Sequence, residues 1–359
     1  MHHDEVERLL SRKCELTPSQ VMRKPREPFP WHQVPYLHHI FEPSATYAQG
    51  AVTTDEIGLR RVVIGGKHLG FRQFQKLTGR KGILLGASTA LSMGASSDAK
   101  SIASQLSSTT EAAWFNLAVG GYVSTQEFFL YCLLNPLDIS DVVVLSGLNT
   151  LSAYAMDPAG STDDVFPPHM YWAPGDNDGL LRSVLRRSVD GCSDGKLARY
   201  LRRMVRSRRA RTLRMREIRE ITDLQVATAL IVTRKNLQLL GDLCRARGAR
   251  LTFVAQPLLS VLRKHLTPEE SEISEIQATL GAYSEFALWG LYADEIAAVY
   301  PKYCQDLGVM CEELKIEYHD LNRSPEFLDG ERWLFTDFAH FTDAGYAICA
   351  ESIRRATLR

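Results

Sequence analysis

A serine, an asparagine and an aspartate–histidine pair stand where their side chains could carry out nucleophilic chemistry. Ser88 follows the apolar run 82–86, Asn149 follows the apolar run 141–145, and Asp337 precedes His340 by three residues. A serine hydroxyl becomes a nucleophile when a histidine accepts its proton, and a carboxylate can orient that histidine. These residue types therefore predict a Ser–His–Asp arrangement, provided that the fold brings the three segments together.

Each of these residues also has a simpler interpretation. Ser88 and Asn149 could each cap a helix, and Asp337 could cap the C-terminal helix with His340 on the surface. Gly121 could belong to an ordinary turn, or its flexible backbone could direct an N–H group into a site. A backbone N–H and an asparagine amide are both suitable donors to an oxyanion. Each motif leaves both interpretations open, and only their combination favours a catalytic site.

Five segments, four of them mainly apolar, predict the strands that would position these groups. They are residues 82–86, 114–118, 141–145, 251–255 and 315–318. Helical stretches such as 126–134 lie between them, which is typical of βαβ units in a mostly parallel α/β sheet. A further apolar helix is expected near the C-terminus, at 347–353. Binding groups gather at the carboxyl ends of such strands, and Ser88, Gly121 and Asn149 all follow predicted strands.

Taken in order, these segments resemble the sequence blocks of the SGNH (GDSL-like) hydrolase superfamily, in a loosely related bacterial branch. Gly86-Ala87-Ser88 matches the first block, Gly121 the second, Gly147-Leu148-Asn149 the third, and Asp337 with His340 the last. The resemblance implies that Ser88 is the nucleophile, His340 the general base and Asp337 the acid that orients it. It also implies an oxyanion hole formed by the N–H groups of Ser88 and Gly121 and the amide of Asn149.

Two positions depart from the family pattern. Ala87 stands where the superfamily's name motif has aspartate, and Thr150 stands where many members have aspartate after the asparagine. Neither change removes a catalytic group, but no substrate can be carried over from close subfamilies. Segments 55–60, 253–257 and 266–270 also resemble the bacterial branch.

The resemblance covers about residues 80 to 358 and implies a flavodoxin-like three-layer α/β/α sandwich with a mostly parallel five-stranded sheet. We expect residues 1–78 to form an N-terminal extension packed on this core, because prolines between 25 and 35 oppose a long helix there. Residues 61–64, followed by two glycines, predict a strand and a turn. Residues 79–359 would form the SGNH-like domain, with a helical lid insertion at about 151–221.

That insertion contains a strongly basic segment. Residues 182–219 hold fourteen basic and three acidic side chains, a formal charge of +11. One interpretation is a solvated lid surface, and the other is a face that binds an acyl carrier protein, a coenzyme A thioester or an anionic polymer. On the second interpretation the substrate-binding residues are Arg199, Arg202, Arg203 and Arg206. Nucleic acid is disfavoured because the segment has a single aromatic residue, Tyr200.

Composition excludes several other classes. The chain has 42 basic and 42 acidic residues and is 45% hydrophobic, which opposes global disorder and a polycationic nucleic-acid binder. No apolar run approaches the ~18 residues of a membrane span, and the N-terminus lacks the pattern of a secretory signal. Seven cysteines without a C-x-x-C pair and histidines without metal-ligand spacing agree with a cytoplasmic protein that has no disulfide framework and no metal site. The acyl chemistry that the resemblance implies requires no cofactor.

These observations favour a serine-dependent acyl hydrolase, an esterase or thioesterase acting on a small or carrier-bound acyl substrate through an acyl-serine intermediate. An acyltransferase would use the same residues with an alcohol or amine acceptor, and the sequence does not separate the two because exclusion of water depends on closure of the site. A catalytically silent fold used for binding is opposed by the complete set of Ser88, Asp337 and His340.

Overall fold

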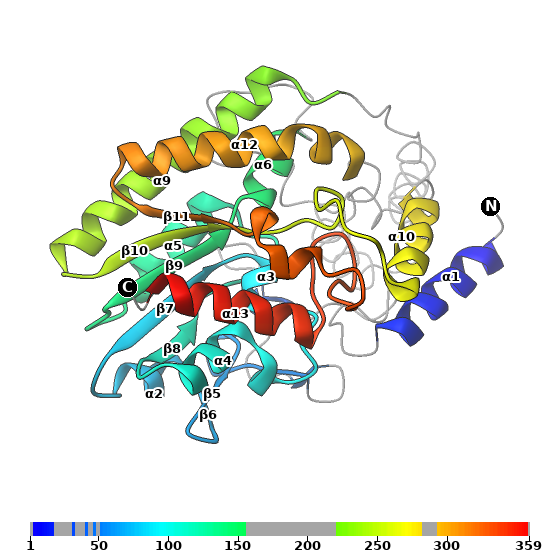
Figure 1. Cartoon of the computed structure of the whole chain (residues 1–359). Coiled ribbons are helices and arrows are strands. Elements are labelled where there is room, and N and C mark those ends of the chain that lie inside the picture. The colour runs from blue at the N-terminus through cyan, green and yellow to red at the C-terminus, as the bar shows by residue number, and fades with distance from the viewer. Residues whose placement is uncertain are drawn as a thin grey trace, which may run out of the picture.

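Five parallel strands form the central sheet of the protein, seen in a computed structural model that describes residues 3–17, 31–32, 40–41, 46–47, 51–155, 220–281 and 293–357 (Figure 1). The strands are β7 (Lys81–Gly86), β8 (Ala113–Asn116), β9 (Asp141–Ser146), β10 (Arg250–Ala255) and β11 (Glu317–Asp320). They lie in the order β8-β7-β9-β10-β11, and every neighbouring pair is parallel. This is the flavodoxin-like order 2-1-3-4-5, so the predicted fold class is confirmed.

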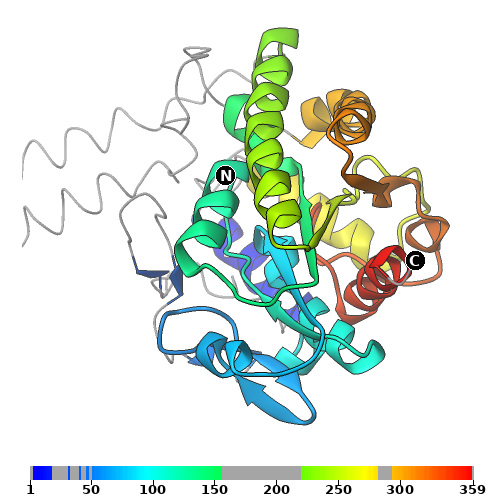
Figure 2. The same cartoon turned by 90° about the vertical axis from the view of Figure 1, so that its left-hand side faces the viewer.

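Helices cover both faces of the sheet and complete the three layers. One face packs against α5 (Ser124–Leu134), α9 (Asp223–Ala246) and α12 (Ala293–Glu313), and α6 (Leu148–Ala155) packs on α9. The other face packs against α4 (Ile102–Thr109) and α13 (Asp343–Thr357). Figures 1 and 2 both show α9 and α12 on the side of the molecule opposite the small hairpin formed by β5 (Val62–Ile64) and β6 (Lys67–Leu69).

The remaining described elements are short, apart from two helices. The helices are α1 (His3–Leu16), α2 (Phe71–Gln75), α3 (Ser88–Leu91) and α10 (Pro268–Gly281), and the 3₁₀ turns are η2 (Asp98–Lys100), η4 (Leu321–Arg323) and η5 (Pro325–Leu328). Two-stranded antiparallel pairs are formed by β1 (Trp31–His32) with β2 (Ile40–Phe41) and by β3 (Thr46–Tyr47) with β4 (Val52–Thr53).

The two edges of the central sheet differ in chemistry. Strands β7 and β9 are buried along their whole length, as expected of central parallel strands that are covered on both faces. At the amino edge the Asp141 side chain, 2% exposed, lies 2.9 Å from Arg80 and 2.7 Å from Arg250. The carboxyl edge, at the opposite end of the strands, is where the residues singled out by the sequence follow β7, β8 and β9.

The N-terminal region is more regular than the sequence indicated. Residues 3–16 form helix α1, within the extension where we expected no long helix. Helix α1 packs on α10 (Figure 1), and Arg12 Nε lies 2.6 Å from Glu272 Oε1. The spacing of Val6, Leu9 and Leu10 is the helical signal present in this stretch. The strand expected at 61–64 is present as β5, and its turn residues Gly65 and Gly66 have positive φ angles of 57° and 76°.

The structure describes only some of the residues on which the predicted domain boundaries depend. Side chains of residues 51–78, Phe71 and Phe74 among them, belong to the same buried cluster as the sheet, and a boundary at 78 stays a prediction. Of the insertion expected at 151–221, residues 151–155 continue α6, whereas 156–219 lie outside the described residues. The basic segment and its arginines at 199, 202, 203 and 206 therefore stay a prediction.

Three predicted element bounds are corrected. The fifth strand begins at Glu317 and ends at Asp320, two residues later than expected, because α12 ends at Glu313 and Lys315 turns the chain with a φ of 57°. The second strand ends at Asn116 rather than at 118, and the C-terminal helix begins at Asp343 rather than at 347. None of the helices that the structure describes is long and apolar enough to cross a membrane.

Candidate active site

Ser88 sits on a sharp turn between β7 and α3 that depends on glycine. Gly86 has a φ of 147°, and a Cβ atom there would lie 2.2 Å from the carbonyl oxygen of Leu145. Only a residue without a side chain fits this position without strain. The N-cap residue is Ala87, and Ser88 is the first residue of the helix, half-buried. The capping interpretation of Ser88 is therefore wrong.

The segment after Ser88 is fixed by a buried arginine. The Arg60 side chain is 0% exposed, and its Nη1 donates to the carbonyl oxygens of Leu91 (3.0 Å) and Ser92 (2.7 Å), at the end of α3. Burial lowers the pKa of Arg60, and the carboxylate of Asp98, 2.9 Å from Nε, opposes that shift. The short helix that carries Ser88 is thus tied to the N-terminal segment.

Asp337 and His340 lie on a tight hairpin formed by residues 334–342. The N–H of Thr336 donates to the carbonyl of His340 (2.9 Å), and the N–H of Thr342 donates to the carbonyl of Leu334 (2.9 Å). The hydroxyl of Thr89 donates to the carbonyl of Ala339 at 3.1 Å. This bond joins the helix that carries Ser88 directly to the 334–342 hairpin.

The hairpin brings the three predicted residues into a continuous hydrogen-bonded chain. His340 Nε2 lies 2.7 Å from Ser88 Oγ, and His340 Nδ1 lies 2.8 Å from Asp337 Oδ2. The side chains of His340 and Asp337 are 13% and 7% exposed. Asp337 Oδ1 accepts the backbone N–H groups of Ala339 (2.9 Å) and His340 (2.7 Å), so both carboxylate oxygens are engaged.

The charge on Asp337 fixes which nitrogen of His340 carries the proton. Burial raises the pKa of the Asp337 carboxyl, but the ion pair and hydrogen bond with His340 and the N–H of Ala339 together hold it well below its ordinary value. An ionised carboxylate only accepts hydrogen bonds, so Nδ1 must be the donor. In the neutral ring, Nε2 then presents its lone pair to the hydroxyl of Ser88, as proton abstraction requires.

Two of the predicted oxyanion donors, Gly121 and Asn149, lie on segments that are joined by hydrogen bonds. Asn149 lies in the first turn of α6, 7% exposed, and its Nδ2 donates to the carbonyl of Tyr122 at 3.0 Å. The amide nitrogen of asparagine has two N–H donors, and the bond to Tyr122 uses only one of them. The N–H of Ser124 donates to Thr150 Oγ1 at 3.0 Å. The amide of Asn149 therefore binds the segment after Gly121 instead of capping its own helix.

The two backbone donors, the N–H groups of Ser88 and Gly121, have no acceptor among the described residues. Gly121 is exposed and has a φ of 80°, which glycine adopts readily. Within the described part of the chain, the N–H groups of Gly121 and Ser88 donate to no other group. The Ser88 N–H lies at the start of a helix, where no carbonyl one turn earlier can accept it. Both remain available to a ligand.

Sequence reasoning missed a buried glutamate on α5, the helix that follows Gly121 in the chain. Glu127 on α5 is buried, and its Oε1 accepts the hydroxyl of Ser146 at 2.7 Å, at the end of β9. Burial raises the pKa of Glu127 to about 8. The available signal was a lone acidic residue within the apolar helical stretch 126–134.

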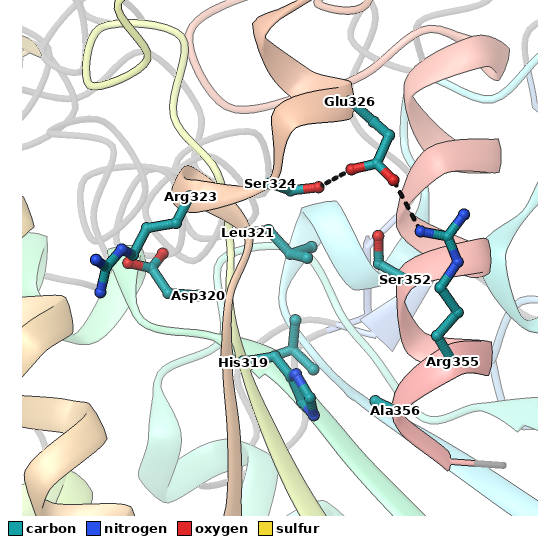
Figure 3. A pocket seen from close by; sticks show the side chains of 10 residues that line it. His319, Asp320, Leu321, Arg323, Ser324, Glu326, Ser352, Arg355 and Ala356 are labelled. Carbon is teal, nitrogen blue, oxygen red and sulfur yellow. Dashed lines mark hydrogen bonds and ion pairs between the residues drawn. The ribbon is translucent and has the colours of Figure 1, made fainter. Parts of the chain in front are cut away.

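A polar cavity of about 240 Å³ lies between the end of β11 and helix α13, away from these residues (Figure 3). Its Glu326 accepts the hydroxyl of Ser324 (2.6 Å) and pairs with Arg355 (2.8 Å), as the dashed lines in Figure 3 mark. Because these groups satisfy one another and none of the predicted site residues lines the cavity, the candidate site is the Ser88 region. Among the described residues, no cluster of three or more His, Cys, Asp or Glu side chains could hold a metal ion.

Comparisons with known proteins find similarity in structure. No protein-family model matches the chain, and a search of curated proteins finds no match. The chain is similar to an acetyl xylan esterase (10% identity, TM-score 0.38, covering 77% of this chain and 99% of that one). It is also similar to a GDSL-like lipase from Bacteroides thetaiotaomicron (12%, 0.37, covering 77% and 86%) and an extracellular lipase from Streptomyces rimosus (13%, 0.38, covering 78% and 100%). At such low identities and TM-scores, the fold assignment depends on the chain's own strand order and register.

Proposed function

We propose that the protein is a distant SGNH-type serine hydrolase that cleaves ester bonds. The observation that carries the proposal is the chain of hydrogen bonds from Ser88 through His340 to Asp337, with distances of 2.7 and 2.8 Å. The three residues come from a strand-to-helix turn and from a hairpin about 250 positions later. If each residue only capped a helix or lay on the surface, the three side chains would have no reason to form hydrogen bonds with one another.

The proposed reaction begins when Ser88 Oγ attacks the carbonyl carbon of an ester and His340 Nε2 takes the hydroxyl proton. The negative charge on the carbonyl oxygen would be stabilised by the N–H groups of Ser88 and Gly121 and by the amide of Asn149. His340 then returns the proton to the departing alkoxide, and an acyl-serine remains. Water, deprotonated by His340, attacks the acyl carbon. The bond to Ser88 Oγ then breaks, His340 returns the proton to Oγ, and the acid is released.

Labelling with a fluorophosphonate tests this proposal. We expect the purified protein to form one covalent adduct at Ser88 and to hydrolyse short acyl esters, whereas Ser88→Ala should lose both properties. Adduct formation is read by intact mass and peptide mapping. Labelling that persists in Ser88→Ala would reject Ser88 as the nucleophile. Offering alcohol and amine acceptors beside water, with product masses read directly, separates a hydrolase from an acyltransferase.

Removal of the side-chain oxyanion donor should reduce turnover more than binding. For Asn149→Ala we expect kcat to fall by about 10²- to 10³-fold with a small change in KM, because the donor acts on charge that develops in the transition state. Asn236→Ala is the matched control, because this side chain is also 7% exposed but bonds to Ser124 Oγ and Thr125 Oγ1 from α9. Equal losses of kcat in the two variants would argue against an oxyanion role for Asn149.

A further inference from the structure

Residues Thr267-Pro268-Glu269-Glu270 form a capping box at the start of α10. Glu270 Oε2 accepts the N–H of Thr267 at 3.1 Å, and the N–H of Glu270 donates to Thr267 Oγ1 at 3.3 Å. In a capping box the glutamate serves the end of its own helix, and one oxygen is sufficient for that bond. The other carboxylate oxygen of Glu270 is therefore left for another partner.

That second oxygen binds the base of the 334–342 hairpin. Glu270 Oε1 accepts the backbone N–H groups of Leu334 (2.9 Å) and Phe335 (3.1 Å). Phe335 pairs across the hairpin with Phe341, and Asp337 and His340 lie between the two. One side chain thus connects the beginning of α10 to the loop that carries the base and the acid.

A buried lysine completes the arrangement. Lys264 Nζ lies 2.9 Å from Glu270 Oε2, also donates to the carbonyl of Arg332 (3.1 Å), and both side chains of the pair are 0% exposed. An apolar pair of similar volume is often as stable as a buried ion pair, so stability alone is a weak reason for these charges. Apart from the capping-box bond with Thr267, the polar contacts that the pair makes outside α10, within the described part of the chain, are with residues 332–335, at the base of the hairpin.

We propose that Glu270, neutralised by Lys264, is a positioning residue that sets the 334–342 hairpin so that His340 Nε2 meets Ser88 Oγ. The inference rests on the proposed hydrolase function. Glu270 touches neither Ser88 nor His340 and acts only through the backbone of Leu334 and Phe335. A misplacement of about 1 Å in such a loop can cost about 10² in rate. Loss of the two hydrogen bonds at the base of the hairpin should therefore lower kcat.

Two double variants separate the positioning bonds from the ion pair. Lys264→Met with Glu270→Gln removes both charges but keeps a side-chain carbonyl that can accept from Leu334 and Phe335. Lys264→Met with Glu270→Leu removes the charges and that acceptor. We expect the leucine variant to lose about 10² in kcat and in the rate of fluorophosphonate labelling at unchanged KM, and the glutamine variant to stay within about tenfold of the unmodified protein. Equal rates in the two double variants would overturn the proposal.

Two further variants guard against a general effect on folding. Asp141→Asn breaks a buried ion pair at the opposite edge of the sheet, so it should lower the melting temperature without lowering kcat. If the leucine variant does not fold, Glu270→Asp keeps the charge beside Lys264 but withdraws the carboxylate by one methylene, and an unchanged kcat would then reject the proposal. Failure of the hydrolase function itself would appear differently, as an absence of Ser88 labelling in the unmodified protein.

Discussion

Replacing Asp337 by asparagine should lower kcat by about four orders of magnitude, an effect of the size found when a triad aspartate becomes asparagine. The structure gives the reason. Asp337 Oδ1 accepts two backbone N–H groups, so the amide oxygen of asparagine would take that position and its NH₂ group would replace Oδ2. The NH₂ group would donate to His340 Nδ1, the proton of the neutral ring would move to Nε2, and Nε2 could no longer accept the proton of Ser88.

This prediction is checked by steady-state kinetics on a short acyl ester together with the rate of fluorophosphonate labelling. Asp343→Asn is a suitable control, because Asp343 binds the N–H of Ser96 (2.8 Å) at the start of α13 and does not contact His340. We expect the control to retain kcat. A loss of less than tenfold in Asp337→Asn would show that His340 does not depend on Asp337 for its tautomer. Because Ser88 and His340 act as one unit, Ser88→Ala with His340→Ala should be no slower than either single variant.

The parts of the fold that could be predicted from the sequence are those that local pattern determines. Strands β7 and β9 are buried along their length and apolar in their central residues because both faces are covered. This made them recognisable in the sequence as short apolar runs bounded by glycine or polar residues. The candidate site residues follow such strands or precede the last helix. Their residue types were sufficient to predict that the serine, histidine and aspartate lie in contact. The distances between them depend on the geometry of the hairpin and were known only from the structure.

The supporting residues could not be predicted, because their partners are distant in the sequence. Arg60 has the residue type of a surface charge, yet it is buried against carbonyls of residues 91 and 92. The capping box at 267–270 is a local signal, but the second role of Glu270 depends on N–H groups 64 and 65 positions later. Helix α1 has a local signal, the helical spacing of its apolar residues. The prolines between 25 and 35 led us to expect no long helix in the whole extension.

A second large effect is expected on stability at Glu127, where the carboxyl is buried beside Ser146 and burial raises its pKa to about 8 from an ordinary value near 4.5. Below pH 4.5 the carboxyl is neutral in both the folded and the unfolded chain. Between pH 4.5 and 8 the unfolded chain releases this proton and the folded chain retains it, so the stability that the neutral form contributes is lost as the pH rises. Each pH unit in that window costs about 1.4 kcal/mol.

Glu127→Gln should remove this dependence while keeping the hydrogen bond, since the amide oxygen can still accept from Ser146. We expect the free energy of unfolding of the variant to equal that of the unmodified protein at pH 4.5 and to exceed it by about 4 kcal/mol at pH 8. Denaturant titrations at several pH values measure the difference, and other titrating groups cancel in it. Glu111→Gln, at an exposed position, is the control and should show no such trend. A difference that is flat from pH 5 to 8 would mean that Glu127 is ionised in the folded protein, and that water or another group stabilises its charge beside Ser146.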